Sequence, residues 1–495
     1  SGNENSLCCG ELYRSNLLEK CCLLESNRAS VEDICLVHSA DYVEKIKSTQ
    51  NMSNKEELEE FSSNYEFIYV NENTWDAASL SAGCAITLME NVLKNPGTNG
   101  FAAIRPPGHH ASFDAACGVC IFNNVAICAK KARKLGVDRV LIVDWDVHAG
   151  QGTQYAVEND TGIRLISIHR FEHGTFWPNL PESCALHPYK NTINVPLNQK
   201  GYGDSEYASI FNFLVMPVIA DWQPQLILVS CGFDAALGDG AKEEVTPGMY
   251  GYMTGKLTSL GIPLCLFFEG GYWAQSIAYC ARFTLNALIV KEAPKIDLHL
   301  SKPHPSLLES LFSTMYVSEG WSNIVNIWLN YVNELRRTNG MREITTPKDE
   351  YKSKREISGP YQTRGVFKSY DKETQDAFYN QLLKILENYI IPRTNKPNIR
   401  IALNRNGLSF MSEMQHSVNL DVIDVSQMAA IYYYILFPLS INNAIDLTMT
   451  LNQFLTASRN AGNNLQENSH DFSAVQRETL SEIIVTYKLE DYFLF

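Results

Sequence analysis

The 495-residue chain has no run of about 18 consecutive apolar residues, the length that a membrane-spanning helix requires. Charged residues are scarce at 19%, where about 25% is usual, and hydrophobic residues make up 45%. This composition excludes a disordered protein or a coiled coil and provides enough apolar material for a large core. The sequence shows no charged-then-apolar secretion signal, so a cytoplasmic and/or nuclear protein is expected.

Positive charge is also scarce, because the formal net charge is −14 and the pI is near 5.3. A field of this sign repels nucleic acid and anionic membranes, so neither is expected as a direct partner. Cysteine is absent from the last 495 − 280 = 215 residues, although thirteen cysteines lie between Cys8 and Cys280. This uneven distribution is compatible with two parts of different origin.

Short apolar runs recur through the first part, separated by stretches of helix length. The runs are Phe101–Ile104, Val140–Val143, Ile163–Ile168, Leu226–Val229 and Ile262–Phe268. Unbroken runs of this length are typical of strands buried on both faces, and helix-length spacers are typical of crossover connections. With helices expected at Ala77–Val92 and Asn124–Leu135, the pattern predicts an α/β fold with a central, mostly parallel sheet.

The alternation fades after about Leu298, and a helical stretch at Leu307–Arg337 is expected to pack back on the sheet domain. We therefore predict one domain over residues 1–340. Residues 341–374 are polar, contain Pro347 and Pro360, carry the sequence KSKR at 352–355, and read as a linker or long loop. Residues 375–495 are expected to form a small α+β appendage that could bind a protein partner. Its expected elements are helices at Gln375–Tyr389, Val425–Pro438 and Ala474–Tyr487 around a strand at Ile399–Leu403.

Clusters of polar residues follow four of the apolar runs. They are RPPGHHA with His109 and His110, DWDVHAGQG with Asp144, Asp146 and His148, SCGFDAALGD with Asp234 and Asp239, and EGGY with Tyr272. The carboxyl ends of parallel strands share one edge of a sheet, where ligands usually bind. These side chains are therefore expected to converge, although an aspartate such as Asp239 at a strand end is as often a helix cap.

The residue types in these clusters point to a catalytic metal. Asp146 and His148 flank one residue, so in an extended segment both side chains point to the same face. With a carboxylate from another strand end, they give three ligands and leave a position for water, which is typical of catalytic zinc. The tandem histidines would supply a base and an acid, and Tyr272 an oxyanion donor. Together these groups predict amide hydrolysis.

The motifs as a set resemble the zinc-dependent histone deacetylase family, in particular class IIb domains. RPPGHHA, VLIVDWDVHAGQGTQ, SIHRFEHGTFWP, GFDAALGD and FEGGY carry the resemblance, and LVHSADYVEKIKSTQ at 36–50 extends it to residues 10–295. The resemblance implies the three-layer arginase–deacetylase α/β fold. It also implies one catalytic zinc ion and a structural potassium ion.

Individual roles follow from the same resemblance. Asp146, His148 and Asp234 would bind zinc, His110 would be the general base and acid, and His109 its charged partner. Asp144 would orient His109, Gln151 stands where the family has Asp or Asn beside the second histidine, and Tyr272 would polarise the acetyl carbonyl. Gly118, Val119, Trp177 and Ala241 map to the substrate tunnel. The potassium site would use the side chains of Asp144 and Ser167 and the carbonyls of Asp146, His148 and Ile168.

Several positions depart from the family pattern. Ala149 replaces the second histidine of DxHHG, Val119 replaces an aromatic wall of the tunnel, and the HPxRP rim segment is absent. Ala241, seven residues after Asp234, stands where the acetylpolyamine branch has a glutamate. The loop that contains Ala241 is one residue shorter than in that branch. Ala241 therefore argues against a polyamine substrate.

We therefore predict a zinc-dependent deacetylase that acts on N6-acetyl-lysine in a protein or peptide such as a histone or tubulin. Three alternatives stay open. They are an acetylpolyamine deacetylase, a binuclear arginase-like hydrolase, and a weakly active acetyl-lysine-binding scaffold.

Overall fold

The computed structural model describes residues 17–186, 189–293, 303–318, 326, 330, 333, 337, 343, 345–348, 351–356, 358–363 and 371–390. The chain divides into two compact units. One consists of Ser1–Ser301 and Glu350–Pro397, and the other of Lys302–Asp349 and Asn398–Phe495. The predicted strand at Ile399–Leu403 and the predicted helices at Val425–Pro438 and Ala474–Tyr487 lie outside the described residues, so the α+β appendage stays a prediction.

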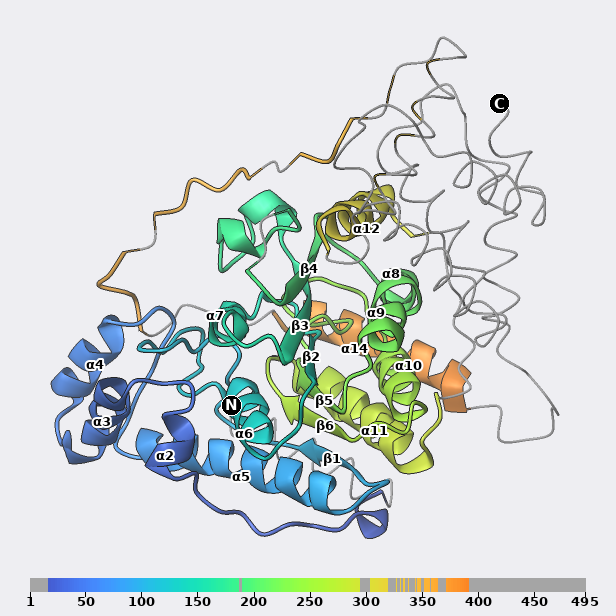
Figure 1. Cartoon of the computed structure of the whole chain (residues 1–495). Coiled ribbons are helices and arrows are strands. Elements are labelled where there is room, and N and C mark those ends of the chain that lie inside the picture. The colour runs from blue at the N-terminus through green and yellow to red at the C-terminus, as the bar shows by residue number, and fades with distance from the viewer. Residues whose placement is uncertain are drawn as a thin grey trace, which may run out of the picture. The chain divides into compact units, whose positions relative to one another are not determined.

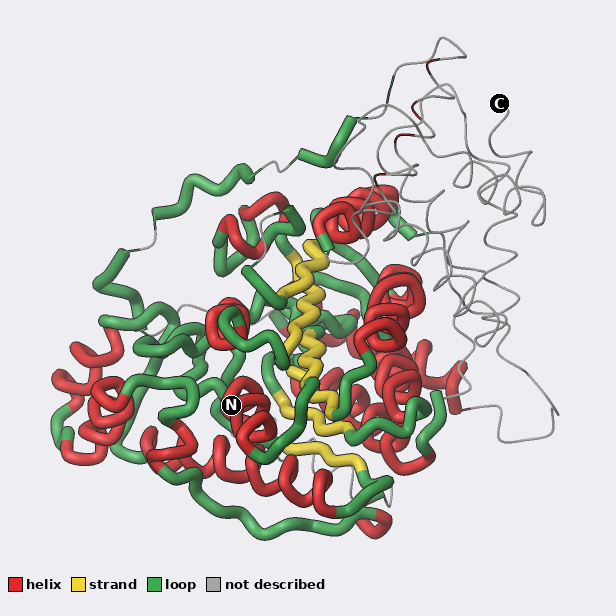
Figure 2. The backbone as a smooth tube through the Cα atoms, in the orientation of Figure 1, coloured by secondary structure: helices red, strands yellow, loops and turns green. Residues whose placement is uncertain are grey.

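A six-stranded sheet forms the centre of the first unit, and all of its strand pairs are parallel. The strand order is β1-β6-β5-β2-β3-β4. The bounds are β1 Asn99–Ala102, β2 Val140–Asp144, β3 Ile163–Arg170, β4 Thr192–Leu197, β5 Leu226–Cys231 and β6 Leu264–Phe268. The predicted parallel α/β sheet is thus confirmed (Figures 1 and 2).

Helices cover both faces of this sheet (Figure 1). One face carries α5 Thr74–Lys94, α6 Asn124–Lys134 and α7 Gln151–Val157, and the other α8 Asp204–Ile210, α9 Met216–Trp222, α10 Pro247–Thr258 and α11 Ala274–Val290. Three short helices, α2 Val31–Ile34, α3 Ala40–Ser48 and α4 Lys55–Ser63, precede α5. Helix α6 begins where Asn123 accepts a hydrogen bond from Ala126 N, and its apolar side chains join β2 and β5 in the core.

All five predicted strands are present, with shifted ends. Strand β1 ends at Ala102, two residues before the predicted end at Ile104. The chain then reaches Pro106, which has no amide hydrogen with which to continue a ladder. Strand β4 was not predicted, because Pro196 interrupts its short apolar pattern. An edge strand tolerates this proline.

The helix predicted at Gln375–Tyr389 is present as α14, Lys372–Ile390. It belongs to the first unit, where Leu382 is fully buried and lies in one apolar cluster with Trp273 and Phe378. Of the helix predicted at Leu307–Arg337, the structure describes α12, Pro305–Val317, as a continuous helix. None of the described helices is long and apolar enough to cross a membrane.

Candidate active site and metal centre

The predicted site residues gather at the carboxyl ends of four adjacent strands, β1, β6, β5 and β2. His109 and His110 follow β1, Asp146 and His148 follow β2, Asp234 follows β5, and Tyr272 follows β6. Residues up to 163 positions apart in sequence, 109 to 272, therefore reach one edge of the sheet. The topology explains the convergence that the sequence predicted.

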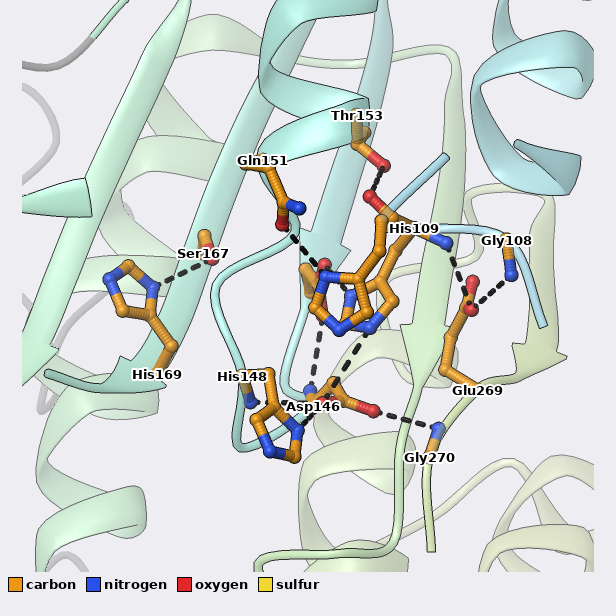
Figure 3. A network of polar contacts seen from close by, with 12 residues as sticks. Gly108, His109, Asp146, His148, Gln151, Thr153, Ser167, His169, Glu269 and Gly270 are labelled. Atoms are coloured by element: carbon orange, nitrogen blue, oxygen red, sulfur yellow. Dashed lines mark hydrogen bonds and ion pairs between the residues drawn. The ribbon is translucent and has the colours of Figure 1, made fainter. Parts of the chain in front are cut away.

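Asp146, His148 and Asp234 form a group with converging donor atoms, in which both aspartates are buried and His148 is partly buried. Nδ1 of His148 lies 3.1 Å from a carboxylate oxygen of Asp146 and 3.1 Å from one of Asp234. Backbone amides fix both carboxylates, because Gly270 N donates to Asp146 Oδ2 at 2.7 Å and Val147 N to Asp234 Oδ1 at 2.8 Å. Figure 3 shows Asp146 between His148 and the Gly270 amide.

This donor set fits a zinc ion. Each of the three residues offers a ligand atom within 4.8 Å of the others, and two carboxylates with one imidazole leave a further coordination position. Burial and the nearby Asp146 carboxylate raise the pKa of Asp234 to about 6. Burial lowers the pKa of His148, but Asp146 and Asp234 outweigh burial and raise it to about 9. These shifts indicate excess negative charge, which a divalent cation would offset.

The tandem histidines are buried in contact with each other, and their rings lie 3.9 Å apart. His109 Nδ1 donates to Asp144 Oδ2 at 3.0 Å. Burial lowers the pKa of His109, but Asp146 and Asp144 outweigh burial and hold it well above its ordinary value. Burial, His109 and His148 lower the pKa of His110 well below its ordinary value. His109 is therefore charged and His110 neutral at pH 7.

Gln151 fixes the tautomer of His110. Its Oε1 lies 2.7 Å from His110 Nδ1, and its Nε2 donates to Cys117 Sγ at 3.5 Å. An amide oxygen can only accept, so Nδ1 of His110 must carry the hydrogen. In the neutral ring Nε2 is then unprotonated and can accept a proton. Gln151 thus contacts the second histidine, as the sequence predicted, with an amide in place of the family's shorter side chain.

Glu269 is a site residue that the sequence analysis missed. It follows β6 in the EGGY motif, is buried, and accepts hydrogen bonds at Oε2 from Gly108 N at 2.7 Å and His109 N at 3.1 Å (Figure 3). Burial raises its pKa to about 7. Its carboxylate, His109 and Cys120 also place three possible ligand atoms together. Glu269 fixes the backbone of the tandem histidines, and a buried acid beside two glycines was the available signal.

Asp239 orients the segment that carries Tyr272. Its Oδ2 accepts from Tyr272 N at 2.7 Å and from Trp273 N at 3.0 Å, and its Oδ1 accepts from Gly240 N at 2.6 Å. Asp239 therefore fixes the backbone just before α11 and is not its N-cap, because that position is held by Trp273 without a side-chain cap. Tyr272 is 51% exposed, so it lies at the open side of the site.

Two of the predicted tunnel residues, Trp177 and Gly118, lie next to the histidines. Trp177 packs edge-on against His110 at 4.5 Å and His148 at 5.5 Å. Gly118 has a positive φ of +53°, and a Cβ there would lie 2.5 Å from Trp177 and 2.6 Å from His110. No side chain fits at this position. Val119 is 42% exposed, and its amide donates to the carbonyl of Phe67, whose ring packs edge-on against Trp177 at 5.5 Å.

Phe176 was missed as a wall residue. Its ring stacks on His148 at 5.3 Å with 15° between the planes, and the Arg170 guanidinium lies 4.2 Å from its centre. The same arginine donates to the carbonyl of Ala241. Glu243, two residues further, is buried and accepts from Tyr202 N at 2.6 Å. The Glu243 carboxylate is therefore engaged inside the protein and is not free to face a substrate.

The potassium site stays a prediction. Asp144 and Ser167 are register partners on β2 and β3. Asp144 Oδ1 accepts from Asp146 N at 3.1 Å, and Ser167 Oγ lies 2.8 Å from His169 Nδ1 (Figure 3). The two side chains are neighbours, and both have protein partners.

Gly232, directly after β5, lies against the backbone of Asp146. A Cβ at this position would be 2.2 Å from Asp146 Oδ2 and 2.7 Å from Asp146 Cα. Gly232→Ala is therefore expected to displace this carboxylate and to weaken zinc binding by about tenfold or more. Zinc content after dialysis against a graded chelator measures the effect.

Gly240→Ala is the matched control, because a Cβ there meets no atom within 4 Å. It should bind zinc like the wild type. Equal zinc affinity in both variants would contradict the proposed position of Asp146 at the metal.

Comparison with known proteins places this geometry in a family. Residues 5–288 match the histone deacetylase domain. The mouse protein named polyamine deacetylase HDAC10 is 41% identical over 310 residues, which are 61% of this chain and 46% of that protein. Histone deacetylase HDA1 of Candida albicans is 40% identical over 292 residues, or 57% of this chain and 35% of that one. The chain thus spans less than half the length of these relatives.

A solved structure agrees with the sequence comparison. The crystal structure of the HDA15 HD domain superimposes with a TM-score of 0.57 at 30% identity and covers 66% of this chain and 88% of that one. The domain match includes every predicted metal ligand and both tandem histidines. The chain therefore belongs to class II of the zinc-dependent histone deacetylase family.

Proposed function

We propose that this protein hydrolyses the acetyl amide of N6-acetyl-lysine in proteins, with zinc as its cofactor. The observation that carries the proposal is the difference between the two buried histidines. His109 is held as a cation by Asp144 and Asp146, while His110 is neutral and oriented by Gln151. A neutral imidazole beside a metal centre is the group that amide hydrolysis requires as general base.

Asp146, His148 and Asp234 would hold the zinc ion. When bound, zinc polarises an acyl carbonyl and makes a nearby water more acidic. His110 Nε2 removes a proton from the attacking water while the water oxygen bonds to the acetyl carbon. The Tyr272 hydroxyl donates a hydrogen bond to the developing oxyanion. His110 then transfers the proton to the lysine nitrogen as the amide bond breaks, releasing acetate and the free amine.

His109 stabilises this sequence electrostatically. Its ring contacts His110, and its charge keeps the His110 pKa low, so His110 readily gives up the proton that it has gained. Asp144 holds the charged ring, and Glu269 holds the backbone amide of the same residue. Each histidine thus has its own anchor.

Acetylpolyamine hydrolysis is the second candidate, because four similar vertebrate proteins, including the mouse protein, are named polyamine deacetylase. A polyamine substrate carries cationic amines, which a carboxylate at the rim would recognise. At the corresponding position this chain has Ala241, and the neighbouring Glu243 is buried. These features favour acetyl-lysine. An acetylated protein or peptide is thus the proposed substrate, and cytoplasm or nucleus the proposed location.

Turnover of an acetyl-lysine peptide and of N-acetylspermidine by the zinc-loaded protein tests the choice. We expect kcat/KM for the peptide to be about tenfold higher or more, since Ala241 stands where the polyamine branch has its glutamate, and we expect a hydroxamate to abolish turnover. Ala241→Glu should shift the ratio toward acetylspermidine. A higher value for acetylspermidine in the wild type would establish the second candidate. Zinc binding without turnover of either substrate would favour the scaffold.

A further inference from the structure

A segment from far along the chain, residues 351–356, crosses the loop that carries Trp177. We call this segment the strap. The Tyr351 hydroxyl donates to the carbonyl of Asn179, and Arg355 Nη1 donates to Asn179 Oδ1 at 2.8 Å. Lys352 N also donates to the carbonyl of His173 at 2.7 Å. The strap is thus bonded to the loop at both ends.

The same arginine reaches a second loop. Arg355 Nη2 pairs with Oε1 of Glu66, and its guanidinium lies 6.0 Å from the centre of the Phe67 ring. The Glu66 side chain is only 9% exposed and that of Arg355 is 34% exposed. A buried carboxylate requires a charged or hydrogen-bonding partner, so this contact orders both loops.

Both anchor points connect directly to the walls beside the histidines. The carbonyl of Glu66 accepts from Gly118 N at 2.9 Å, and that of Phe67 accepts from Val119 N at 3.0 Å. Asn179 follows Trp177 by two residues, and Asn179 N donates to the carbonyl of Phe176 at 3.0 Å. One guanidinium therefore bridges the Gly118 side and the Trp177 side of the site.

From this bridge we infer that Arg355 is a positioning residue that sets the width of the acyl-lysine channel. The inference rests on the proposed function, because it assigns the two loops to the walls that bind the lysine stem. The strap lies beside both of these loops, because it contacts His173 and Asn179 on one loop and Glu66 on the other. A planar guanidinium suits the task, because its two arms bond two acceptors at fixed spacing, whereas a lysine cannot.

Loss of the bridge lets the walls separate and weakens the packing around the lysine stem. This packing is similar in the bound substrate and in the transition state, so its loss raises KM and leaves kcat nearly unchanged. A general loss of folded protein would instead lower the apparent kcat and leave KM unchanged. The split between KM and kcat distinguishes positioning from stability.

The test compares Arg355→Gln with Lys354→Gln in the zinc-loaded full chain. Both variants remove one positive charge from the strap, but Lys354 is exposed and makes no hydrogen bond or ion pair with the described residues of either wall. We expect Arg355→Gln to raise KM for an acetyl-lysine peptide about tenfold, with kcat within about twofold of the wild type. Lys354→Gln should match the wild type. The Kd of a hydroxamate with a linear aliphatic linker should rise in parallel with KM.

Arg355→Lys replaces Arg355→Gln in the test if the glutamine variant does not fold. Lysine keeps the positive charge but cannot bond both acceptors as the guanidinium does. Arg355→Lys should also raise KM and Kd. Unchanged KM and Kd in Arg355→Gln, or in Arg355→Lys when the former is unfolded, would overturn the inference. If the wild type has no peptide turnover, the proposed function fails. The hydroxamate Kd then decides the role of Arg355 independently.

Discussion

Replacing His110 with alanine is expected to reduce turnover of an acetyl-lysine peptide by about 10²–10⁴-fold, the usual contribution of general acid–base catalysis. Nε2 of this ring is the unprotonated nitrogen, because Nδ1 donates to Gln151. Its pKa is lowered by burial, by His109 and by His148, so the ring is ready to accept a proton at pH 7. Steady-state turnover with equal zinc loading measures the loss.

Zinc content and hydroxamate affinity serve as controls, since Asp146, His148 and Asp234 are intact in this variant. Both should stay near the wild-type values. Gln151→Leu keeps the imidazole but removes its anchor, so its turnover should lie between those of the wild type and His110→Ala. Wild-type turnover in His110→Ala would show that another group accepts the proton and would leave His109 as the next candidate.

The position of the site was predictable because each polar cluster follows an apolar run. Parallel strands bring their carboxyl ends together, so His110, Asp146 and Asp234 had to approach one another once the strands were assigned. Chain order alone does not give the spatial order of the strands. The order β1-β6-β5-β2 is what places Tyr272 and Asp234 between the histidines and Asp146.

Contacts between distant segments were beyond sequence reasoning. Glu269 binds amides 160 and 161 positions earlier, and Arg355 binds Glu66 289 positions earlier. No local periodicity encodes such pairs. The sequence KSKR at 352–355 was interpreted as part of a linker, because a short basic cluster is typical of a solvated loop. The structure instead gives its arginine two buried polar partners.

The different charges of the two histidines likewise depend on three-dimensional surroundings. In sequence they are identical neighbours. Only the fold places Asp144 on one ring and the amide of Gln151 on the other. The resemblance to a family supplied the roles in advance, and the contacts give the physical reason for them. The choice of substrate is where the two lines of evidence differ, because Ala241 favours acetyl-lysine while similar proteins are named polyamine deacetylases.

Asp234→Asn is expected to remove zinc from the protein and to lower turnover by at least about 100-fold. Asn is nearly isosteric and its oxygen can still accept from Val147 N, so the loop should retain its conformation. The variant loses one negative charge beside Asp146 and His148, which is the charge that a divalent cation requires. Elemental analysis after dialysis, together with turnover, measures both effects.

Asp239→Asn is the matched control, because Asp239 is an equally buried acid five residues further along the chain. Burial raises the pKa of both acids, to about 6 for Asp234 and about 7 for Asp239, so each substitution removes a carboxyl group in a similar environment. Asp239 accepts hydrogen bonds from the backbone of Tyr272 and Trp273. Asp239→Asn should therefore keep zinc, and it should lower turnover only by displacing Tyr272. Full zinc content in Asp234→Asn would exclude this carboxylate as a ligand. Zinc loss in both variants would instead mean that the shared loop, and not the Asp234 carboxylate, determines metal affinity.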